Sequence, residues 1–429
     1  MKPVVLVVGD ALVPTGFARV TESIISRLSC RYSFHQLGIN YGGDPHDMPW
    51  PIYPASLGGD VHGVKRIAGL VSKIRPDIVL IVNDIWVVGL YLESLSPLQP
   101  RPMIIGYMPV DAEPLFPEHV RRLQSLDHIV TYTNFGARSL AAAATELKTL
   151  DSSFVLPPVA TIPHGVDSEV FRPLFPMDAN LIESRRSVRR RLLPHAETIE
   201  DAFIVLNANR NQPRKRIDVT IAGFALFAAD KPANVRLYLH MGVTDCGWDV
   251  RELARRYGIA DRLMLTHSAA SQPDLSLDKL NLVYNTCDVG LNTSESEGWG
   301  LPSFEHAAAG AAQIIPAHTG PREIWEDAAE MLVPTMQVTT PLALSTSQLI
   351  APQTVAAALE RLYRDPALLL SRSLAAFGRA TEPRYRWDTV AQRFDGLLTE
   401  LLATSTENAP SRTMGWMALP LAKSVSDEK

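Results

Sequence analysis

The residues best suited to chemistry in this sequence are two glutamates, Glu297 and Glu305, that lie eight positions apart. Between them, Gly298 and Gly300 let a ligand approach the backbone without obstruction by side chains. An apolar segment precedes the pair and an alanine-rich helix with Pro302 in its first turn follows, so both carboxylates belong to a strand–loop–helix unit. The free N–H groups of a helix N-terminus attract phosphate, and carboxylates accept hydrogen bonds from hydroxyl groups. The combination predicts a ligand that is part phosphate and part hydroxyl-rich, as a nucleotide sugar is.

A basic loop offers a second candidate binding element. Four basic residues lie within the segment Asn207–Arg216, which follows a predicted strand and precedes a helix with an apolar stripe. A charged loop at a surface is usually only solvated. This loop follows the carboxyl end of a strand, however, and ligands bind at such ends in parallel α/β sheets. Arg210 and Lys215 are therefore predicted to place positive charge over the same cleft as the glutamates.

The elements that must position these residues follow from the alternation of short apolar segments with amphipathic helical segments along the chain. Such alternation predicts parallel sheets covered by helices on both faces. The expected fold class is α/β, with two Rossmann-like doubly wound domains that face a central cleft. The expected parts are an N-terminal domain (1–166), a linker (167–177), a C-terminal domain (178–385), a helix that returns to the first domain (386–404) and a flexible tail (405–429).

Composition excludes several classes of protein. A chain of 429 residues is too long for one ordinary core, and 46% hydrophobic with 20% charged residues is typical of a soluble globular protein. No apolar run reaches the roughly 18–20 residues needed to span a bilayer. The segment Val4–Val8 is followed closely by Asp10, which favours a buried strand over a secretory signal. Three scattered cysteines predict neither a disulfide framework nor a metal cluster, so the cytoplasm is the expected compartment. A net charge of −5 argues against a general nucleic-acid coat protein.

Arg210 and Lys215, together with Glu297, Glu305 and the Gly-Trp-Gly-Leu-Pro sequence between the two glutamates, resemble the motifs of the retaining GT-B glycosyltransferases. This is the large family that includes sucrose synthases and bacterial mannosyl- and glucosyltransferases. The segments 162–167 (Ile-Pro-His-Gly-Val-Asp) and 319–323 (Thr-Gly-Pro-Arg-Glu) support the match. The resemblance implies a GT-B fold and transfer of a hexose from a UDP- or GDP-linked sugar to an acceptor hydroxyl, with retention of configuration.

The resemblance also implies roles for the residues of the C-terminal domain, which would bind the donor. Arg210 and Lys215 would hold the diphosphate and neutralise the charge of the leaving nucleotide. Glu297 would accept hydrogen bonds from sugar hydroxyls and Glu305 from ribose hydroxyls. The backbone N–H groups facing the sugar and phosphates would be those of Gly298, Trp299, Gly300 and Leu301. The chain contains no Asp-x-Asp pair to hold a diphosphate through a metal, so catalysis without a metal or another cofactor is expected.

The N-terminal domain would contact the acceptor. Gly16 lies in the loop 9–17, which matches the family's first loop, although many members have two adjacent glycines there. The resemblance implies that this loop approaches the diphosphate as well as the acceptor, so Gly16 would help to bind the donor. Asp111 follows the strand 103–107 and takes the place where relatives often carry a functional histidine. This aspartate would either orient or deprotonate an acceptor hydroxyl, or cap the next turn. In the unusual first loop and in Asp111, the sequence resembles glycosyltransferases encoded by viruses and phages.

Several alternatives stay open at the level of the sequence. A nucleotide-sugar epimerase of the same fold and a nucleotide-sugar-binding protein without turnover would share the donor motifs. The acceptor would be a glycan, a lipid-linked glycan, a small molecule, a protein or a modified DNA base, and the oligomeric state is open. The basic run 184–191 resembles a nucleic-acid patch but is interpreted as a solvated helix face. His164 replaces the asparagine common in its turn and is interpreted as structural.

Overall fold

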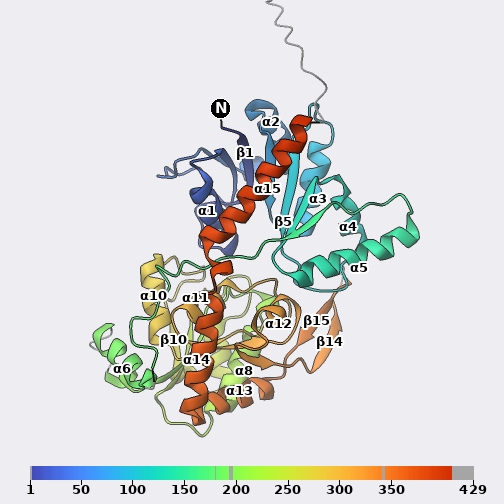
Figure 1. The fold of residues 1–429 in the computed structure, drawn as a ribbon. Helices are drawn as coiled ribbons and strands as arrows, with labels where there is room; N and C mark the ends of the chain where they lie inside the picture. The colour runs from blue at the N-terminus through green and yellow to red at the C-terminus, as the bar shows by residue number, and fades with distance from the viewer. Residues whose placement is uncertain (1, 179, 193–196, 341–343, 408–429) are drawn as a thin grey trace, which may run out of the picture.

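The computed structural model describes residues 2–178, 180–192, 197–340 and 344–407, which form two large parallel sheets and one small hairpin (Figure 1). The first sheet has the order β3-β2-β1-β4-β5-β6-β7, and the second has the order β10-β9-β8-β11-β12-β13. The strands of the first sheet are β1 (Val4–Asp10), β2 (Ser33–Ile39), β3 (Ile52–Pro54), β4 (Ile78–Val82), β5 (Met103–Met108), β6 (His128–Thr131) and β7 (Val159–Thr161). Those of the second are β8 (Phe203–Asn207), β9 (Val235–Leu239), β10 (Leu263–Leu265), β11 (Val289–Leu291), β12 (Ala312–Pro316) and β13 (Glu330–Leu332); β14 (Met336–Thr339) and β15 (Thr346–Leu349) form the antiparallel hairpin.

Helices follow the strands in both series, as the alternating sequence pattern predicts. In the first series they are α1 (Gly16–Leu28), α2 (Val64–Ile74), α3 (Ile85–Leu95), α4 (Pro117–Arg122) and α5 (Asn134–Leu150). In the second they are α6 (Leu181–Leu192), α7 (Glu197–Glu200), α8 (Ile217–Ala228), α9 (Val250–Arg256), α10 (Leu277–Thr286), α11 (Leu301–Ala308), α12 (Thr319–Trp325), α13 (Pro352–Arg364), α14 (Pro366–Ala380) and α15 (Trp387–Glu407). Short 3₁₀ turns lie at Leu57–Gly59, Leu123–Ser125, Pro213–Lys215, Ala260–Arg262 and Pro383–Tyr385. None of the helices in the described ranges combines the length and the apolar character needed to cross a membrane.

The strand order reverses at one point in each sheet, and these two points decide where a ligand fits. In the first sheet β1 pairs with β2 on one side and β4 on the other, and in the second sheet β8 lies between β9 and β11. The helices that follow such neighbouring strands cover opposite faces, which leaves a crevice at the carboxyl ends of the strands. The loops after β1, β4, β8 and β11 are thus the ones expected to line a binding site.

The start of α1 and the presence of α3 differ from what the sequence pattern predicts. Helix α1 begins at Gly16 instead of near Ala18, because the hydroxyl of Thr15 caps it by accepting a hydrogen bond from the Ala18 N–H at 3.2 Å. Gly16 is therefore the first residue of a helix and not part of a free loop. The search for amphipathic segments does not predict helix α3, because its sequence is apolar on nearly every side and lacks an apolar stripe.

The last helix leaves the second domain and packs on the first. Figure 1 shows α15, in red, running over the N-terminal domain, whereas α14 lies beside the second sheet. The carboxylate of Asp395 on α15 accepts a hydrogen bond from the Tyr32 hydroxyl at 2.9 Å, and Arg27 of α1 donates to Asp388 at 2.6 Å. Trp387, at the start of α15, is buried. Residues 408–429, most of the predicted tail, lie outside the described residues.

Direct hydrogen bonds also join the two domains across the cleft. The carboxylate of Glu323, on α12, accepts from the backbone N–H groups of Asn134 at 2.9 Å and Phe135 at 2.6 Å, in the first turn of α5. The first N–H groups of a helix have no partner within the helix and carry its positive dipole end, so a carboxylate from another element stabilises them. The Thr346 N–H of the hairpin donates to the Glu113 carbonyl at 3.0 Å.

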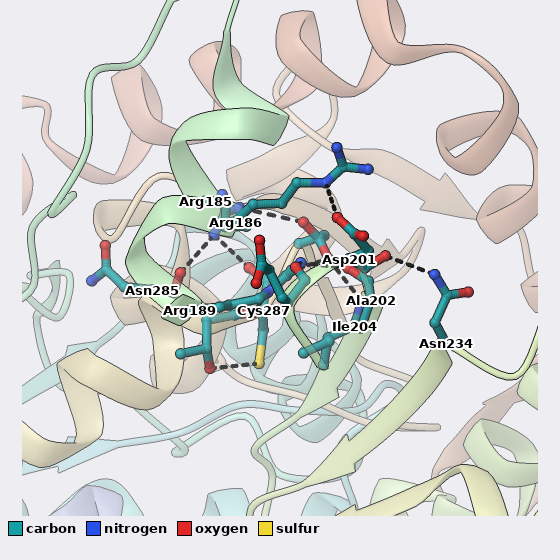
Figure 2. A network of polar contacts seen from close by, with 12 residues as sticks. Arg185, Arg186, Arg189, Asp201, Ala202, Ile204, Asn234, Asn285 and Cys287 are labelled. Atoms are coloured by element: carbon teal, nitrogen blue, oxygen red, sulfur yellow. Dashed lines mark hydrogen bonds and ion pairs between the residues drawn. The ribbon is translucent and has the colours of Figure 1, made fainter. Parts of the chain in front are cut away.

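The basic run 184–191 differs from its interpretation as a solvated helix face. Arg185 and Arg189, both labelled in Figure 2, are 1% and 2% exposed. Both guanidinium groups face the buried carboxylate of Asp288. Their remaining N–H groups donate to backbone carbonyls, including Arg185 to Gly310 at 2.9 Å and Arg189 to Thr286 at 2.8 Å. Buried charges are tolerated when they are paired and fully hydrogen-bonded, so these two arginines can be buried while only the rest of the run is solvated. These two arginines anchor α6 to the second sheet.

Replacing Asp288 by alanine should lower the free energy of unfolding by about 3–5 kcal/mol, because two buried guanidinium groups lose the carboxylate that faces them. Urea unfolding of the variant and the wild type measures the difference. Glu183→Ala is the matched control: Glu183 pairs with Arg190 and Arg186 at the exposed face of the same helix, and its removal should leave the midpoint unchanged. A midpoint for Asp288→Ala equal to that of the control would contradict the anchoring role.

Candidate functional site

A cleft of about 590 Å³ lies between the two sheets. Its walls come from the loops after β1, β4, β8 and β11, where the strand orders reverse. All the residues singled out from the sequence line this cleft: Gly16, Asp111, Arg210, Lys215, Glu297, Gly298, Trp299, Gly300, Leu301 and Glu305. The fold therefore brings together residues from both halves of the chain, and their individual roles stay predictions.

A buried ionic cluster occupies the centre of the cleft. The ammonium group of Lys215 pairs with the carboxylate of Glu297, and these side chains are 7% and 5% exposed. The Arg214 guanidinium lies 3.8 Å from Glu297 and 3.8 Å from Asp111, so it bridges the two domains. Burial raises the pKa of Glu297, but Lys215 and Arg214 outweigh it and hold the pKa at about 2. Burial and the neighbouring Arg214 lower the pKa of Lys215 to about 8, although Glu297 acts in the opposite direction.

Glu305 has two partners that the sequence patterns do not indicate. Arg19, from α1 of the first domain, forms an ion pair with it, and the Tyr284 hydroxyl of α10 donates to it at 2.8 Å. Glu305 is 2% exposed, so its charge depends on these contacts. The position of Arg19, one helical turn after Gly16, is the only sequence signal that points to it.

Arg210 projects into the cleft from the loop after β8. Its Nε donates to Asp245 at 2.7 Å and its Nη2 to the same carboxylate at 3.1 Å, which fixes the plane of the guanidinium. The side chain remains 41% exposed, so other faces of the group are open to a ligand. The sequence pattern does not predict a role for Asp245, because this residue lies in the loop after β9, away from any motif.

The glycine-rich loop between Glu297 and α11 is held from behind by α12. Gly300 has a φ of 89°, a left-handed conformation that favours glycine, and it leads directly into the first turn of α11. Gly320 packs so closely that a Cβ there would lie 2.1 Å from the Gly298 carbonyl oxygen. The Thr319 hydroxyl donates to the Glu297 carbonyl at 2.8 Å. The segment 319–323 thus supports the loop, which explains its place beside the two glutamates in the sequence pattern.

Two buried donors in the cleft have no hydrogen-bond partner among the described residues, the Tyr132 hydroxyl and the Trp299 Nε1. These side chains are 5% and 4% exposed. A buried polar group without a partner destabilises a protein by about 1–3 kcal/mol, so such groups usually meet water or a ligand. Protein atoms cover both groups, so a ligand in the cleft would reach them only after the surrounding side chains move.

His164 lines the same part of the cleft, which its interpretation as a structural residue does not anticipate. The Tyr107 hydroxyl has one proton, and it faces the carbonyl oxygens of Ile162 at 3.1 Å and Pro163 at 3.3 Å. We therefore assign the proton of the 2.7 Å contact between Tyr107 and His164 to the histidine Nδ1. Burial lowers the pKa of His164 to about 3, although Glu297 raises it. The ring is neutral, with Nε2 as a hydrogen-bond acceptor.

Carboxylates dominate the wall formed by the first domain. Asp10, at the end of β1, accepts hydrogen bonds from Thr15 at 2.6 Å and Asn40 at 3.1 Å. Asp84 follows β4, and burial together with the nearby Asp111 raises its pKa to about 6. Both aspartates follow predicted strands, so the argument that singled out Arg210 applies to them as well. Among the described residues, no group of three or more His, Cys, Asp or Glu side chains has an arrangement that would hold a metal ion.

Comparison with known proteins identifies the architecture. Over 94% of this chain and 100% of the other, the structure superposes on sucrose-phosphate synthase from Thermosynechococcus elongatus with a TM-score of 0.66 and 17% identity. For Anabaena HepE, solved with UDP and glucose, the TM-score is 0.64 at 14% identity, over 93% of this chain and 100% of that one. The chain has the GT-B fold. The predicted α/β class with two doubly wound domains is confirmed.

Sequence comparison points the same way. A D-inositol 3-phosphate glycosyltransferase from Geodermatophilus obscurus is 30% identical over 199 residues, which are 44% of this chain and 40% of that enzyme. Alignments with four enzymes of this name cover 40% to 62% of their lengths, so the chain spans about half the length of the curated relatives it matches. No protein-family model matches. The resemblance to glycosyltransferases is confirmed, since these relatives are glycosyltransferases.

Stability should fall as the pH is lowered from 7.5 to 5.5. Burial lowers the pKa of four histidines in the described residues to about 3 or 4: His164, His240, His306 and His318. Near pH 5.5 the unfolded chain protonates these rings and the folded chain does not, which removes about 1 kcal/mol per histidine. The raised pKa values of Asp84, Asp10 and Glu22 act in the opposite direction, whereas the lowered pKa values of His35, His119 and His128 add to the loss.

Urea unfolding at the two pH values measures this loss. His318→Asn should show a smaller difference between the two pH values than the wild type, because one of the four groups is gone. An unfolding free energy that is constant or higher at pH 5.5 would contradict the neutral state of these histidines.

Proposed function

We propose that this protein transfers a hexose from a nucleoside diphosphate sugar to an acceptor hydroxyl. The observation that carries the proposal is the cluster of Lys215, Arg210 and Glu297 beside the N-terminus of α11, at the point of a GT-B fold where a ligand binds. The names of the curated relatives, D-inositol 3-phosphate glycosyltransferase, support transfer of a sugar. HepE was solved with UDP and glucose, which favours a UDP-linked donor here.

The donor diphosphate would lie between the basic loop and the start of α11. Departure of the nucleotide builds negative charge on its terminal phosphate, and fixed cations and N–H groups at that point lower the barrier. Arg210 and Lys215 supply the cations, and the N–H groups of residues 298–301 supply aligned dipoles. We infer that these groups act without a metal ion, because they already provide the charge that a metal would supply.

The two glutamates would bind different parts of the donor. Glu297 is ionised, with its pKa held at about 2, and it therefore accepts hydrogen bonds from sugar hydroxyls. Glu305 keeps lone pairs beyond its contacts with Arg19 and Tyr284, and these would accept from the ribose. Trp299 and His164 line the same cleft and are almost fully buried there.

On the acceptor side, Asp111 lies where it would orient or deprotonate the attacking hydroxyl. Its carboxylate is 40% exposed and 3.8 Å from Arg214, so it is both accessible and coupled to the donor cluster. Retention of configuration is part of the proposal because of the resemblance between this chain's motifs and those of retaining enzymes. Analysis of the anomeric linkage of the product by NMR tests that point.

Alanine variants of Glu297, Arg210 and Lys215 should each lower kcat/KM for transfer at least about 100-fold, since fixed charges of this kind are worth about 3 kcal/mol or more at the transition state. Release of UDP from UDP-glucose and related donors is the readout. Arg190→Ala, an exposed arginine of α6, is the control. Rates near the wild-type value for all three variants would refute the site, and a product formed without an acceptor would indicate an epimerase instead.

The affinity for UDP should fall as the pH rises from 7 to 9. Lys215 has a pKa of about 8 in the free protein and is a useful cation only when protonated. The diphosphate stays ionised throughout this range, so the Kd should rise about tenfold through loss of the lysine charge. Calorimetric titration measures the Kd, and Lys215→Arg should make it independent of pH. A wild-type Kd that is constant between pH 7 and 9 would rule out this role for Lys215.

A further inference from the structure

We infer that the acceptor is a neutral, hydroxyl-rich molecule, such as an unphosphorylated sugar or cyclitol, bound against the first-domain wall of the cleft. The inference rests on the proposed function and names the substrate class of the half-site that the donor does not fill. That half-site is formed by Asp10, Asp84, Trp86, Asp111 and Tyr132. We call it the acceptor wall.

The charges of the acceptor wall exclude an anionic ligand. It presents three carboxylates, and the only arginine of the first domain that lines the described cleft, Arg19, is already paired with Glu305. In the proposed function the donor diphosphate occupies Arg210 and Lys215, and Arg214 lies 3.8 Å from both Glu297 and Asp111. A second phosphate, on the acceptor, would therefore face the carboxylates of the wall with these cations already engaged, which is unfavourable.

The hydrogen-bonding groups of the wall match hydroxyls. Asp84 stands at the N-terminus of α3, but its carboxylate makes no capping bond and has no hydrogen-bond partner among the described residues. It is therefore free to accept from a ligand hydroxyl. The Tyr132 hydroxyl also has no partner among the described residues, but protein atoms cover it, so Tyr132 contributes only its ring to the wall. A ligand hydroxyl donates to a carboxylate without adding charge, so a polyol satisfies Asp84.

An apolar surface completes the wall. Trp86 lines the cleft two residues after Asp84 and is 46% exposed, although an indole ring of this size is normally covered. Phe116 and His119 form an edge-on ring pair, 5.1 Å between centroids, in the same lining. Sites for small molecules combine aromatic surface with a few fixed polar groups, and the C–H face of a sugar ring packs on such a surface. These features separate this acceptor from the phosphorylated inositol in the relatives' name.

Matched acceptor sets test the inference. UDP release from the donor is measured at pH 7.5, where Asp84 is ionised, with a set of neutral sugars and cyclitols and with the same compounds as phosphates. The neutral set should accelerate release about 100-fold more than the phosphates at equal concentration, as two buried like charges imply. Faster release with the phosphates, or no acceleration by either set, overturns the inference.

A reaction with the donor and no acceptor distinguishes a wrong acceptor class from a failure of the proposed function. UDP binding and slow hydrolysis of the donor in this reaction establish the donor site independently of any acceptor. If both are absent, the proposed function itself is wrong, and the inference falls with it.

Two variants locate the acceptor. Asp84→Asn and Trp86→Ala should each raise the acceptor KM about tenfold and leave the Kd for UDP within about twofold, because neither residue touches the donor cluster. Trp86 is exposed, so its replacement does not disturb the core and keeps the test valid if the aspartate variant folds poorly. Glu118→Gln, an exposed acid on α4, is the charge-matched control. An unchanged acceptor KM in both variants would place the acceptor elsewhere.

Discussion

The arrangement of this protein depends on how buried charge is balanced at the centre of the cleft. Lys215 and Glu297 are buried, and each of these two charges is stable only because the other is present, with the partly exposed Arg214 beside them. Asp111 extends the balance to the first domain through Arg214. A ligand with its own negative charge therefore does not simply add to the cluster. It must replace part of the carboxylate contacts of the cations. A diphosphate could do so, because its anionic oxygen atoms accept hydrogen bonds from lysine and arginine as a carboxylate does.

The two domains share one topology and use it to place different side chains at the cleft. In each sheet the loops after the first strand and its crossover neighbour meet at the same edge, which gives Asp10 and Asp84 in one domain and Lys215 and Glu297 in the other. The second domain adds cations and a helix N-terminus, whereas the first adds carboxylates and aromatic rings. One fold thus provides two chemically different walls, and the distinction resides in a few residues at strand ends.

The architecture and the set of residues that meet in the cleft follow from local sequence signals, whereas the roles of those residues stay predictions. Alternating apolar and amphipathic segments identify the strands, and Glu297, Glu305, Arg210 and Lys215 stand at recognisable spacings. The partners Arg19, Asp245 and Tyr284 come from distant elements, and no local spacing connects them with the glutamates. Helix α3 is missed because a helix buried on most sides has no amphipathic period. The burial of Arg185 and Arg189 is also not predicted, because their partner Asp288 is distant in the sequence and lies beside them only in the folded chain.

The cap that Glu323 places on α5 has a consequence for how fast ligands exchange. The N–H groups of Asn134 and Phe135 belong to one domain and the carboxylate to the other, so any rotation that widens the cleft must break those bonds. The same movement pulls Arg19 away from Glu305. The N-terminus of α5 therefore links the two domains through hydrogen bonds that close the cleft. Under the proposed function, the rate of nucleotide release would depend on the strength of these hydrogen bonds, which lie away from the reacting atoms.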